Sequence, residues 1–568
     1  MNTDRCIVPA PARRSLACTA PPLALLALLV APRAYGQVTS LVSTAADGTQ
    51  ADSPCSMGDL SDDGRYCAFV SRSRVLGPGT TTANLHVWVK DRATGAIELA
   101  SLLDSGAELD RDCTRPRISA DGRFVVFETA ATNGPGDSNG FFDCYLRDLD
   151  AGTTERVSVG PDGELGNGES RYPVVSGDGR YVLFTSFADN FSDVDFNGTA
   201  DVFLRDRLLG TTTLVSVALD GTSASDYSEA YDLTPDGRFA LFRSASTDIV
   251  AGSIAHWNKV LLRDVVAGVT EQASLTWDGK FVAADCVDGR VTADGRYVTF
   301  TCGSQTVVPG DSNQADDVFL RDRVLGTTER VNVGELEQQD DRGGLRGRPS
   351  DDGRFVLFAS AATNFASTDT NDAGDAYLRD RWRGETRHVS LSTEGLQSKS
   401  GGGNPELSAD GRVAMFLSAT DELVADDRNG VDDIVVHERA PSAATRSSYG
   451  AGFPGWQGIP TVALADDPVI GRPIDLVVSN SAGSWTLGFV LIGGAPLDLP
   501  AGWGGSLLVD PVALLPIPLP PTGYTLAEEV PYDAEFWDVV LYLQVIELDP
   551  GAFEGLSSTA GLEIRFGS

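Results

Sequence analysis

The stretch Ser176-Gly-Asp-Gly-Arg-Tyr-Val-Leu-Phe-Thr-Ser186, followed by Asp201-Val-Phe-Leu-Arg-Asp-Arg207 and Thr213-Leu-Val-Ser-Val217, is one copy of a repeated cassette. Its Asp-Gly-Arg triplet occurs seven times, at intervals of 58, 57, 58, 58, 58 and 58 residues. A fixed period of this length indicates units that each pack an apolar face against a copy of themselves. The triplets, which number the repeats from one to seven, begin at Asp63, Asp121, Asp178, Asp236, Asp294, Asp352 and Asp410.

Each repeat predicts four short strands and no helix, because β-branched and aromatic residues alternate with polar ones at a period of two. In the second repeat these strands are expected at 115–119, 123–129, 144–148 and 155–159. The Asp121-Gly122 pair supplies the tight turn between the first two strands. Four antiparallel strands form one propeller blade, so the sequence predicts an all-β chain with a seven-bladed β-propeller at residues 37–440.

The ends of the repeat array predict how the ring closes. The last repeat supplies a third strand at 433–438 but no fourth strand after it. Val38–Ser43, which precedes the first complete repeat, matches the fourth strand of the other repeats. We therefore expect the N-terminal strand to complete blade seven, since closure removes exposed sheet edges.

The first 36 residues indicate export. Arg13-Arg14 precede an apolar run at 23–30, and a small-x-small motif ends at Gly36. This pattern is typical of a secretory signal peptide at 1–36, cleaved after Gly36, and it predicts a secreted, periplasmic or cell-envelope protein. The mature sequence has no apolar run of about 20 residues, so no transmembrane segment is expected.

A formal charge of −36 argues against nucleic acid as a partner, because phosphates require a basic surface. Six cysteines follow the predicted cleavage site, and export favours disulfides. Cys286 and Cys302 lie eight residues on either side of Asp294, where an Asp-Gly hairpin places them opposite each other. We therefore predict a Cys286–Cys302 disulfide; the other four cysteines give no readable pairing.

Five repeats carry D-x-N-x-x-x-D in the loop between the second and third strands, and the first and fourth repeats lack it. Alternate oxygen-bearing side chains, a tight turn and a later carboxylate are how a short loop wraps Ca²⁺. Asp and Asn are equally common in such loops because they close Asx turns, so structural turn chemistry is the alternative to calcium. The candidate metal ligands are Asp137, Asn139 and Asp143; Asp193, Asp195, Asn197 and Asp201; Asp311, Asn313 and Asp317; Asp369, Asn371 and Asp375; and Asp427, Asn429 and Asp433.

No catalytic constellation is recognisable. Gly136–Gly140 matches G-x-S-x-G, but it stands in phase with the repeated loop rather than on a strand-turn-helix elbow. The four histidines fall in four different repeats, without ligand or nucleophile spacing. The Arg-Asp pair of the third strand recurs too regularly for one active site and indicates an ion pair within each blade or a contact at the strand end.

Over roughly 38–439, the cassette S-x-D-G-R-[YF]-V-x-F-x-S with D-[VA]-[FY]-L-R-D-R resembles TolB-like, WD-repeat-like propeller repeats of exported bacterial proteins. The resemblance implies a propeller with a binding or scaffolding role. We therefore expect a non-enzymatic scaffold for a protein or glycan partner in the envelope or outside the cell. The alternative is an acidic-site glycan hydrolase or lyase on the same scaffold, since abundant carboxylates leave a glycosidase pair open.

The composition of the sequence changes after a predicted linker at 441–448. Residues 449–568 are rich in Gly and Pro, with strand-like apolar runs at 474–478, 487–492 and 539–546. This spacing predicts a C-terminal β-sandwich, and the chain end resembles C-terminal modules of other exported bacterial proteins. Four of the eight tryptophans fall in this region; they favour a buried aromatic core, with a sugar-stacking platform as the alternative.

Overall fold

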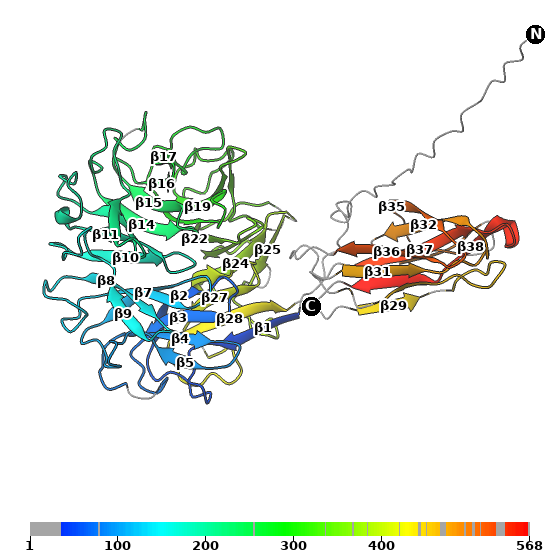
Figure 1. Ribbon diagram of the computed structural model, residues 1–568, viewed down its shortest axis with the longest axis horizontal. Coiled ribbons are helices and arrows are strands. Elements are labelled where there is room, and N and C mark those ends of the chain that lie inside the picture. The colour runs from blue at the N-terminus through cyan, green and yellow to red at the C-terminus, as the bar shows by residue number, and fades with distance from the viewer. Residues whose placement is uncertain are drawn as a thin grey trace, which may run out of the picture. The chain divides into compact units, whose positions relative to one another are not determined.

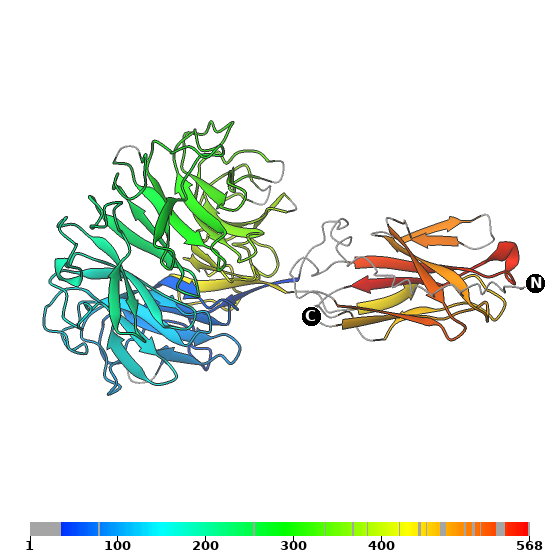
Figure 2. The ribbon, with the colours of Figure 1, turned by 45° about the horizontal axis from the view of Figure 1, so that its top comes forward.

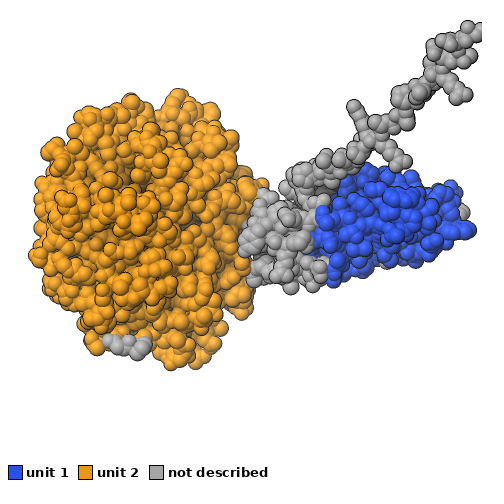
Figure 3. Space-filling model, viewed as in Figure 1, with its two compact units in different colours: residues 1–36, 440–568 blue, residues 37–439 orange. Residues whose placement is uncertain are grey.

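The computed structural model describes residues 36–77, 80–253, 256–334, 337–365, 369–382, 384–419, 421–440, 445–449, 451–465, 468, 473–493, 496–501, 506–509, 511, 513–529 and 540–565. The predicted signal peptide, apart from Gly36, lies outside the described residues. The described chain forms two compact units, Gln37–Arg439 and a C-terminal unit that begins at Ala440 (Figure 3).

Within the described part of Gln37–Arg439, the chain is all-β and builds seven four-stranded antiparallel sheets, arranged as in a β-propeller (Figure 1). Six of them follow the repeats in strict chain order. They are β2 (Cys55–Leu60), β3 (Tyr66–Ser71), β4 (His86–Asp91) and β5 (Ile97–Leu99); β6 (Cys113–Ile118), β7 (Phe124–Thr129), β8 (Asp143–Asp148) and β9 (Thr153–Arg156); β10 (Ser170–Val175), β11 (Tyr181–Ser186), β12 (Asp201–Asp206) and β13 (Thr211–Leu214); β14 (Ser228–Leu233), β15 (Phe239–Ser244), β16 (Lys259–Asp264) and β17 (Val269–Gln272); β18 (Cys286–Val291), β19 (Tyr297–Cys302), β20 (Asp317–Asp322) and β21 (Thr327–Arg330); and β22 (Gly344–Pro349), β23 (Phe355–Ser360), β24 (Asp375–Asp380) and β25 (Glu385–His388). A short 3₁₀ turn, η2 (Asp189–Phe191), lies after β11.

The seventh sheet joins the two ends of the repeat array. Its strand order is β1-β28-β27-β26, so β1 (Gly36–Leu41) hydrogen-bonds to the third strand of the last repeat. Figure 2 shows this strand lying along β28. The pairing that the sequence offset predicts is therefore present. The other strands of this sheet are β26 (Gly403–Leu407), β27 (Val413–Ser418) and β28 (Asp433–Ala440).

The Asp-Gly-Arg triplet makes the same turn in every repeat. In the second repeat, Asp121 Oδ1 accepts hydrogen bonds from the Ser119 hydroxyl at 2.6 Å and the Arg123 amide at 3.0 Å. The Arg123 guanidinium reaches across the sheet to Asp148 at the end of the third strand, at 2.7 Å. The third-strand aspartate is thus in an ion pair within the blade, but its partner is the triplet arginine; the neighbouring Arg147 donates to the Gly152 carbonyl at 2.8 Å instead. The pair closes each sheet at one end. The equivalent pairs are Arg65–Asp91, Arg180–Asp206, Arg238–Asp264, Arg296–Asp322, Arg354–Asp380 and Arg412–Glu438.

The glycine of the triplet packs one sheet against the next. Gly122 has φ +77°, and a Cβ built there would lie 2.1 Å from the Tyr66 ring of the preceding sheet. Gly64 of the first repeat meets Val413 of the seventh in the same way. Any larger residue at these turns would therefore be strained and would force neighbouring sheets apart.

Repeated arginines also connect neighbouring sheets. Arg323, at the end of β20, pairs with Glu271 at 2.5 Å and lies over the Phe239 ring at 4.9 Å, both in the preceding sheet. The same arrangement recurs for Arg207 with Glu155 and Phe124. Aromatic residues and guanidinium groups thus alternate along the boundary between sheets.

The predicted disulfide is confirmed. Cys286 and Cys302 stand opposite each other in the β18–β19 register and are bonded. The same position holds hydrogen-bonded serine pairs in the third and fourth repeats, for example Ser170 with Ser186 at 3.0 Å. The four remaining cysteines of the described chain, Cys55, Cys67, Cys113 and Cys144, are buried and free.

The C-terminal unit contains two larger sheets that share one apolar core. Val462, Leu476 and Val478 from one sheet pack with Val490 and Val545 from the other. Its first strand begins at Thr445, inside the predicted linker 441–448, so this unit starts earlier than its composition indicated. The sheets are β29 (Thr445–Tyr449), β39 (Gly561–Arg565), β37 (Val540–Leu548), β32 (Thr486–Gly493) and β35 (Ala513–Leu519), with β38 (Leu556–Ser558) beside β37; β30 (Val462–Leu464), β31 (Pro473–Val478) and β36 (Tyr524–Glu529); and the pair β33 (Pro496–Pro500) and β34 (Ser506–Val509), with a 3₁₀ turn η4 (Phe553–Gly555). No helix of the described residues is long and apolar enough to span a membrane.

Candidate functional site

Every inner strand of the repeat unit carries a β-bulge near its start. The register shifts between Thr114 and Arg117 in β6, and at the equivalent point in the six other inner strands. A bulge bends the strand and re-aims a side chain. In six of the seven strands the bulged residue has a positive φ of 49–62°, although none is glycine. These residues are Met57, Arg115, Tyr172, Asp288, Arg346 and Asn404.

The bulge residues differ from repeat to repeat. The surrounding cassette keeps its Asp-Gly-Arg turn in all seven copies, whereas the equivalent bulge positions carry Met, Arg, Tyr, Ala, Asp, Arg and Asn. A left-handed backbone costs a non-glycine residue free energy, and such strain gathers at functional sites. The chain uses glycine at most of its other positive-φ positions, so at the bulges it keeps side chains at a conformational cost.

The bulge residues line a cavity of about 550 Å³. Every inner strand, that is, the first strand of each repeat (β2, β6, β10, β14, β18, β22 and β26), contributes to its wall, and we call the space between these strands the central channel. Tyr172 and Tyr231, together with two prolines and four aliphatic side chains, give the wall apolar surface. Five arginines and three carboxylates line the cavity, in a chain whose formal charge is −36. This part of the surface is therefore a local exception to the acidity of the protein. The charged lining residues are Arg115, Arg117, Arg290, Arg346, Arg348, Glu229, Asp288 and Glu406.

The floor of the cavity is a network of ion pairs that crosses the channel. Arg117 lies 3.4 Å from Asp59 and 3.1 Å from Asp232, which come from different repeats. Glu406 lies 3.1 Å from Arg290 and 3.0 Å from Arg348. Three arginines face three carboxyl groups in this network, so their formal charges balance. We call these six side chains the charge plate.

Glu406 is the central acid of the charge plate. Burial alone would raise its pKa, but the guanidinium groups of Arg290, Arg348 and Arg117 hold the pKa of Glu406 down to about 2. The carboxylate is therefore ionised throughout the neutral range. Removing it would leave two buried arginines without their shared anion.

Some polar groups at the cavity are not satisfied by the protein. The exposed Arg346 side chain makes no hydrogen bond or ion pair with any described residue. Asp288 Oδ1 lies 3.3 Å from Arg348, but its buried Oδ2 has no hydrogen-bond partner, and neither does the hydroxyl of Thr301. Buried polar atoms without partners are rare, and each requires an explanation such as a bound ligand or water.

Below the charge plate, the channel narrows to a second cavity of about 130 Å³ at the Asp-Gly-Arg turns. Burial raises the pKa of Asp62 to about 7, and the nearby Asp351 carboxylate adds to the shift. This opening is therefore acidic, whereas the opening at the bulges is rich in arginine.

The predicted metal loops lie at the same end of the sheets as the bulges, and their asparagines form turns. Asn139 Oδ1 accepts from the Phe141 amide at 3.0 Å, and its Nδ2 donates to the Gly166 carbonyl at 3.1 Å. Asn197, Asn313, Asn371 and Asn429 make the same two bonds. The asparagines therefore support the Asx-turn interpretation, and each ties its loop to the connection entering the next inner strand.

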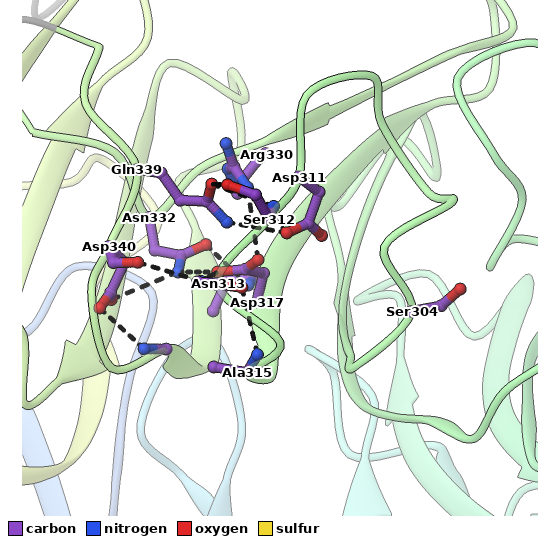
Figure 4. A network of polar contacts seen from close by, with 12 residues as sticks. Ser304, Asp311, Ser312, Asn313, Ala315, Asp317, Arg330, Asn332, Gln339 and Asp340 are labelled. Carbon is purple, nitrogen blue, oxygen red and sulfur yellow. Dashed lines mark hydrogen bonds and ion pairs between the residues drawn. The ribbon is translucent and has the colours of Figure 1, made fainter.

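Unlike the asparagines, the two repeated aspartates of each loop have side chains with little solvent exposure. The last one begins the third strand and accepts a hydrogen bond from the residue that follows the fourth strand, as Asp201 does from Ser216 at 2.6 Å. In the fifth repeat, Arg330 Nη1 lies 3.4 Å from both Asp311 and Asp317 (Figure 4). Arg156 lies 3.4 Å from Asp143 and 4.0 Å from Asp137 in the second repeat. In these two loops a guanidinium group occupies the space between the carboxylates.

The sixth repeat replaces the arginine with other donors. His388 Nε2 lies 3.1 Å from Asp375, and the Tyr377 hydroxyl donates to Asp369 at 2.6 Å. Gln397 Nε2 donates to both aspartates. This loop is therefore satisfied by neutral or weakly basic side chains.

The third and seventh repeats have neither arginine nor histidine at this point. Leu214, one repeat period after Arg156, and Leu41, two repeat periods before it, stand at the position of Arg156 in the fourth strands. Burial raises the pKa of Asp201 to about 7, and the Asp195 carboxylate contributes. Burial likewise raises the pKa of Asp433 to about 6, with a contribution from Asp427.

Not every predicted ligand joins a carboxylate pair. Asp193 is exposed and lies outside the repeat position that Asp195 shares with Asp137. The two repeats without the motif carry His86 and Lys259 where the others have the final aspartate. Lys259 Nζ donates to the carbonyls of Ser246 and Trp257. Among the described residues, no group of three or more His, Cys, Asp or Glu side chains is arranged to hold a metal ion.

Sequence reasoning missed the bulge residues and the charge plate. No glycine marks the positive-φ positions, and the members of the charge plate are separated by more than a hundred residues, as Arg117 and Asp232 are. Aligning the seven repeats and looking for the column that varies would have found the bulge residues.

No protein-family model and no curated protein matches this chain. Solved structures with a similar course of the chain include the WD40 repeats of RRP9, at 8% identity, TM-score 0.38, covering 71% of this chain and 97% of that one. A periplasmic gluconolactonase from Pseudomonas aeruginosa matches at 18% identity and TM-score 0.30, covering 58% and 83%. The tricorn protease matches at 13% identity and TM-score 0.22, covering 88% of this chain and 47% of that one. At these TM-scores the matches record a similar course of the chain and nothing about activity or partners.

Proposed function

We propose that this chain is an exported, non-enzymatic binding scaffold. In this proposal the seven sheets are the blades of one closed propeller, with β1 completing the last blade, and the C-terminal unit is a β-sandwich. The partner, a protein or a glycan of the envelope or the extracellular space, is recognised at the mouth formed by the bulge residues. The observation that carries the proposal is that side chains vary at strained positions around one cavity, while the cassette that builds the fold repeats.

The charged side chains of the cavity restrict the chemical class of the proposed partner. Arg115 and Arg346 present guanidinium groups that attract anions at short range, whereas the acidic surface elsewhere repels them. Arg346 is free to bind, and guanidinium groups pair with carboxylates in a two-pronged geometry. Tyr172 lies 4.3 Å from the Arg115 guanidinium and offers a ring face beside it. We therefore propose that the partner presents an acidic group next to an apolar or sugar-ring face.

The test is a binding screen of the mature protein with acidic polysaccharides, neutral polysaccharides and acidic peptides. We expect Arg115→Ala with Arg346→Ala to lower affinity for the acidic ligand at least tenfold. Arg428→Ala, which removes an exposed arginine paired only with an exposed aspartate elsewhere, is the matched control. Equal binding by the double variant and the native protein would place the site elsewhere. Turnover of a polysaccharide that Asp288→Asn abolishes would favour the hydrolase or lyase alternative.

A further inference from the structure

The five D-x-N loops form an internal series in which one fourth-strand position decides whether a basic side chain lies against the buried carboxylates. Each loop holds two aspartates with little solvent exposure. The fourth strand places Arg156, Arg330 or His388 against them in the second, fifth and sixth repeats. In the third and seventh repeats the same position is Leu214 or Leu41. The leucine loops thus contain two acids and no cation among the described residues.

Unpartnered oxygen atoms mark the leucine loops. Asp427 is 6% exposed and Asp433 is 1% exposed, and each has one buried carboxylate oxygen without a hydrogen-bond partner, Oδ1 and Oδ2 respectively. In the third repeat, Asp195 is 5% exposed and its Oδ1 is also unpartnered. Asp137 of the second repeat has such an oxygen too, but there Arg156 supplies the positive charge. Burying two carboxylates side by side without a counter-charge is costly.

We propose that the third and seventh repeats each bind one Ca²⁺ ion between Asp195 and Asp201 and between Asp427 and Asp433, in place of the arginine of the second and fifth repeats. Calcium takes six to eight oxygen ligands and accepts irregular geometry, so loop carbonyls and water would complete the shell around two carboxylates. The ion supplies the positive charge that the guanidinium groups of Arg156 and Arg330 supply through ion pairs in the second and fifth repeats. This proposal is independent of what binds at the channel mouth.

The proposal predicts a number of ions as well as their presence. Native mass spectrometry and calorimetry of the mature protein with CaCl₂ should show two ions per chain, rather than the five that the motif alone would suggest. Millimolar Ca²⁺ should raise the melting temperature relative to EDTA, because the ion binds only the folded loops. Zero ions, or five, would each overturn the assignment.

Arginine exchange tests the assignment directly. Leu41→Arg with Leu214→Arg copies the natural second and fifth repeats, and should abolish both bound ions while keeping the melting temperature in EDTA at or above that of the native protein. Leu99→Arg is the matched control, since it makes the same substitution in the first repeat, which lacks the carboxylate pair. That control should keep both ions.

Two further variants keep the test decisive if the arginines do not fit. Asp195→Asn with Asp427→Asn preserves shape but removes one charge from each pair, and should lose both ions. Conversely, Arg156→Leu recreates a leucine loop in the second repeat and should add a third ion. Retention of two ions by the Asp→Asn pair, or an unchanged count in Arg156→Leu, would show that the carboxylate pairs do not hold the metal.

Discussion

His437 Nδ1 lies 3.0 Å from the hydroxyl of Thr39, a residue 398 positions earlier in the chain. The Thr39 hydroxyl donates its own proton to the Leu391 carbonyl at 2.6 Å, so it accepts a hydrogen bond from Nδ1–H of His437. Thr39 belongs to β1 and His437 to β28. This contact therefore fastens the strand that joins the N-terminal and C-terminal ends of the repeat array.

We expect acid to destabilise this end of the repeat array, because the buried His437 ring would have to carry a charge. Burial lowers the pKa of His437 to about 4, and Arg439 and His388 oppose its protonation, whereas the Leu391 carbonyl favours it. The unfolded histidine protonates below about 6.5 while the folded ring stays neutral, so stability is lost as pH falls from 6.5 to 4, by up to about 3 kcal/mol. His437→Asn, whose amide can donate to Thr39, should reduce this pH dependence in denaturant titrations. His256→Asn changes an exposed histidine and should leave it intact; identical pH profiles for all three proteins would contradict the assignment.

The charge plate should be sensitive to loss of its central acid. Glu406→Gln leaves Arg290 and Arg348 without their shared carboxylate and should destabilise the protein by about 3–5 kcal/mol, the usual range for breaking a buried pair. Urea unfolding measures the change. Glu385→Gln removes a partner of Arg387 at a more accessible site and should cost under about 1 kcal/mol. Comparable effects of the two substitutions would mean that the channel network contributes no more than a surface pair.

The arginines between sheets should stabilise through stacking and carbonyl contacts more than through their exposed ion pairs. Arg323→Ala removes the Phe239 stacking contact and the hydrogen bond to the Gly295 carbonyl, so we expect a loss of about 1–2 kcal/mol. Glu271→Gln, which removes only the half-exposed anion, should cost less than half of that. Chemical denaturation of both variants distinguishes the contributions. A larger effect from Glu271→Gln would indicate that the ion pair dominates.

The disulfide should be replaceable without loss of the fold. Cys286→Ser with Cys302→Ser copies the hydrogen-bonded serines of the third repeat at the same register. A bridge between residues 16 apart stabilises by about 3 kcal/mol in the loop-entropy model. We therefore expect the serine variant to keep its circular dichroism spectrum and to unfold at lower denaturant, as the native protein does after reduction. An unchanged midpoint would show that the bridge contributes nothing to stability.

The features that the sequence predicted correctly are those with a local signal. The Asp121-Gly122 turn, the alternation of its flanking strands and the position of β1 all follow from residues close in sequence or from the repeat offset. The Cys286–Cys302 bond follows from hairpin geometry alone. The ends of the strands have no such local signal: the sequence predicts the first strand of the second repeat at 115–119, whereas β6 begins at Cys113. Bulges move these boundaries, and their backbone conformation has no composition signal when the bulged residue is not glycine.

The candidate site could not be predicted in the same way, because its contacts join distant repeats. Arg290 and Glu406 meet across the channel although 116 residues separate them. The D-x-N motif was found, but the residue that distinguishes one loop from another stands on the fourth strand, as Arg330 does. A motif search within the loop therefore sees five equivalent copies where side-chain packing creates three kinds of loop.

The bulge residues also bear on how the protein could be engineered and how its sequence could diverge. The bulge residues line the cavity from a backbone that has a similar left-handed conformation in six of the seven repeats, so residues can be exchanged between these repeats without altering the total composition. A variant in which Tyr172 and Arg346 trade places would present the same chemical groups in a new circular order. In the binding scaffold proposed above, the circular order of these side chains would set specificity, so one backbone could present many distinguishable faces at nearly constant stability.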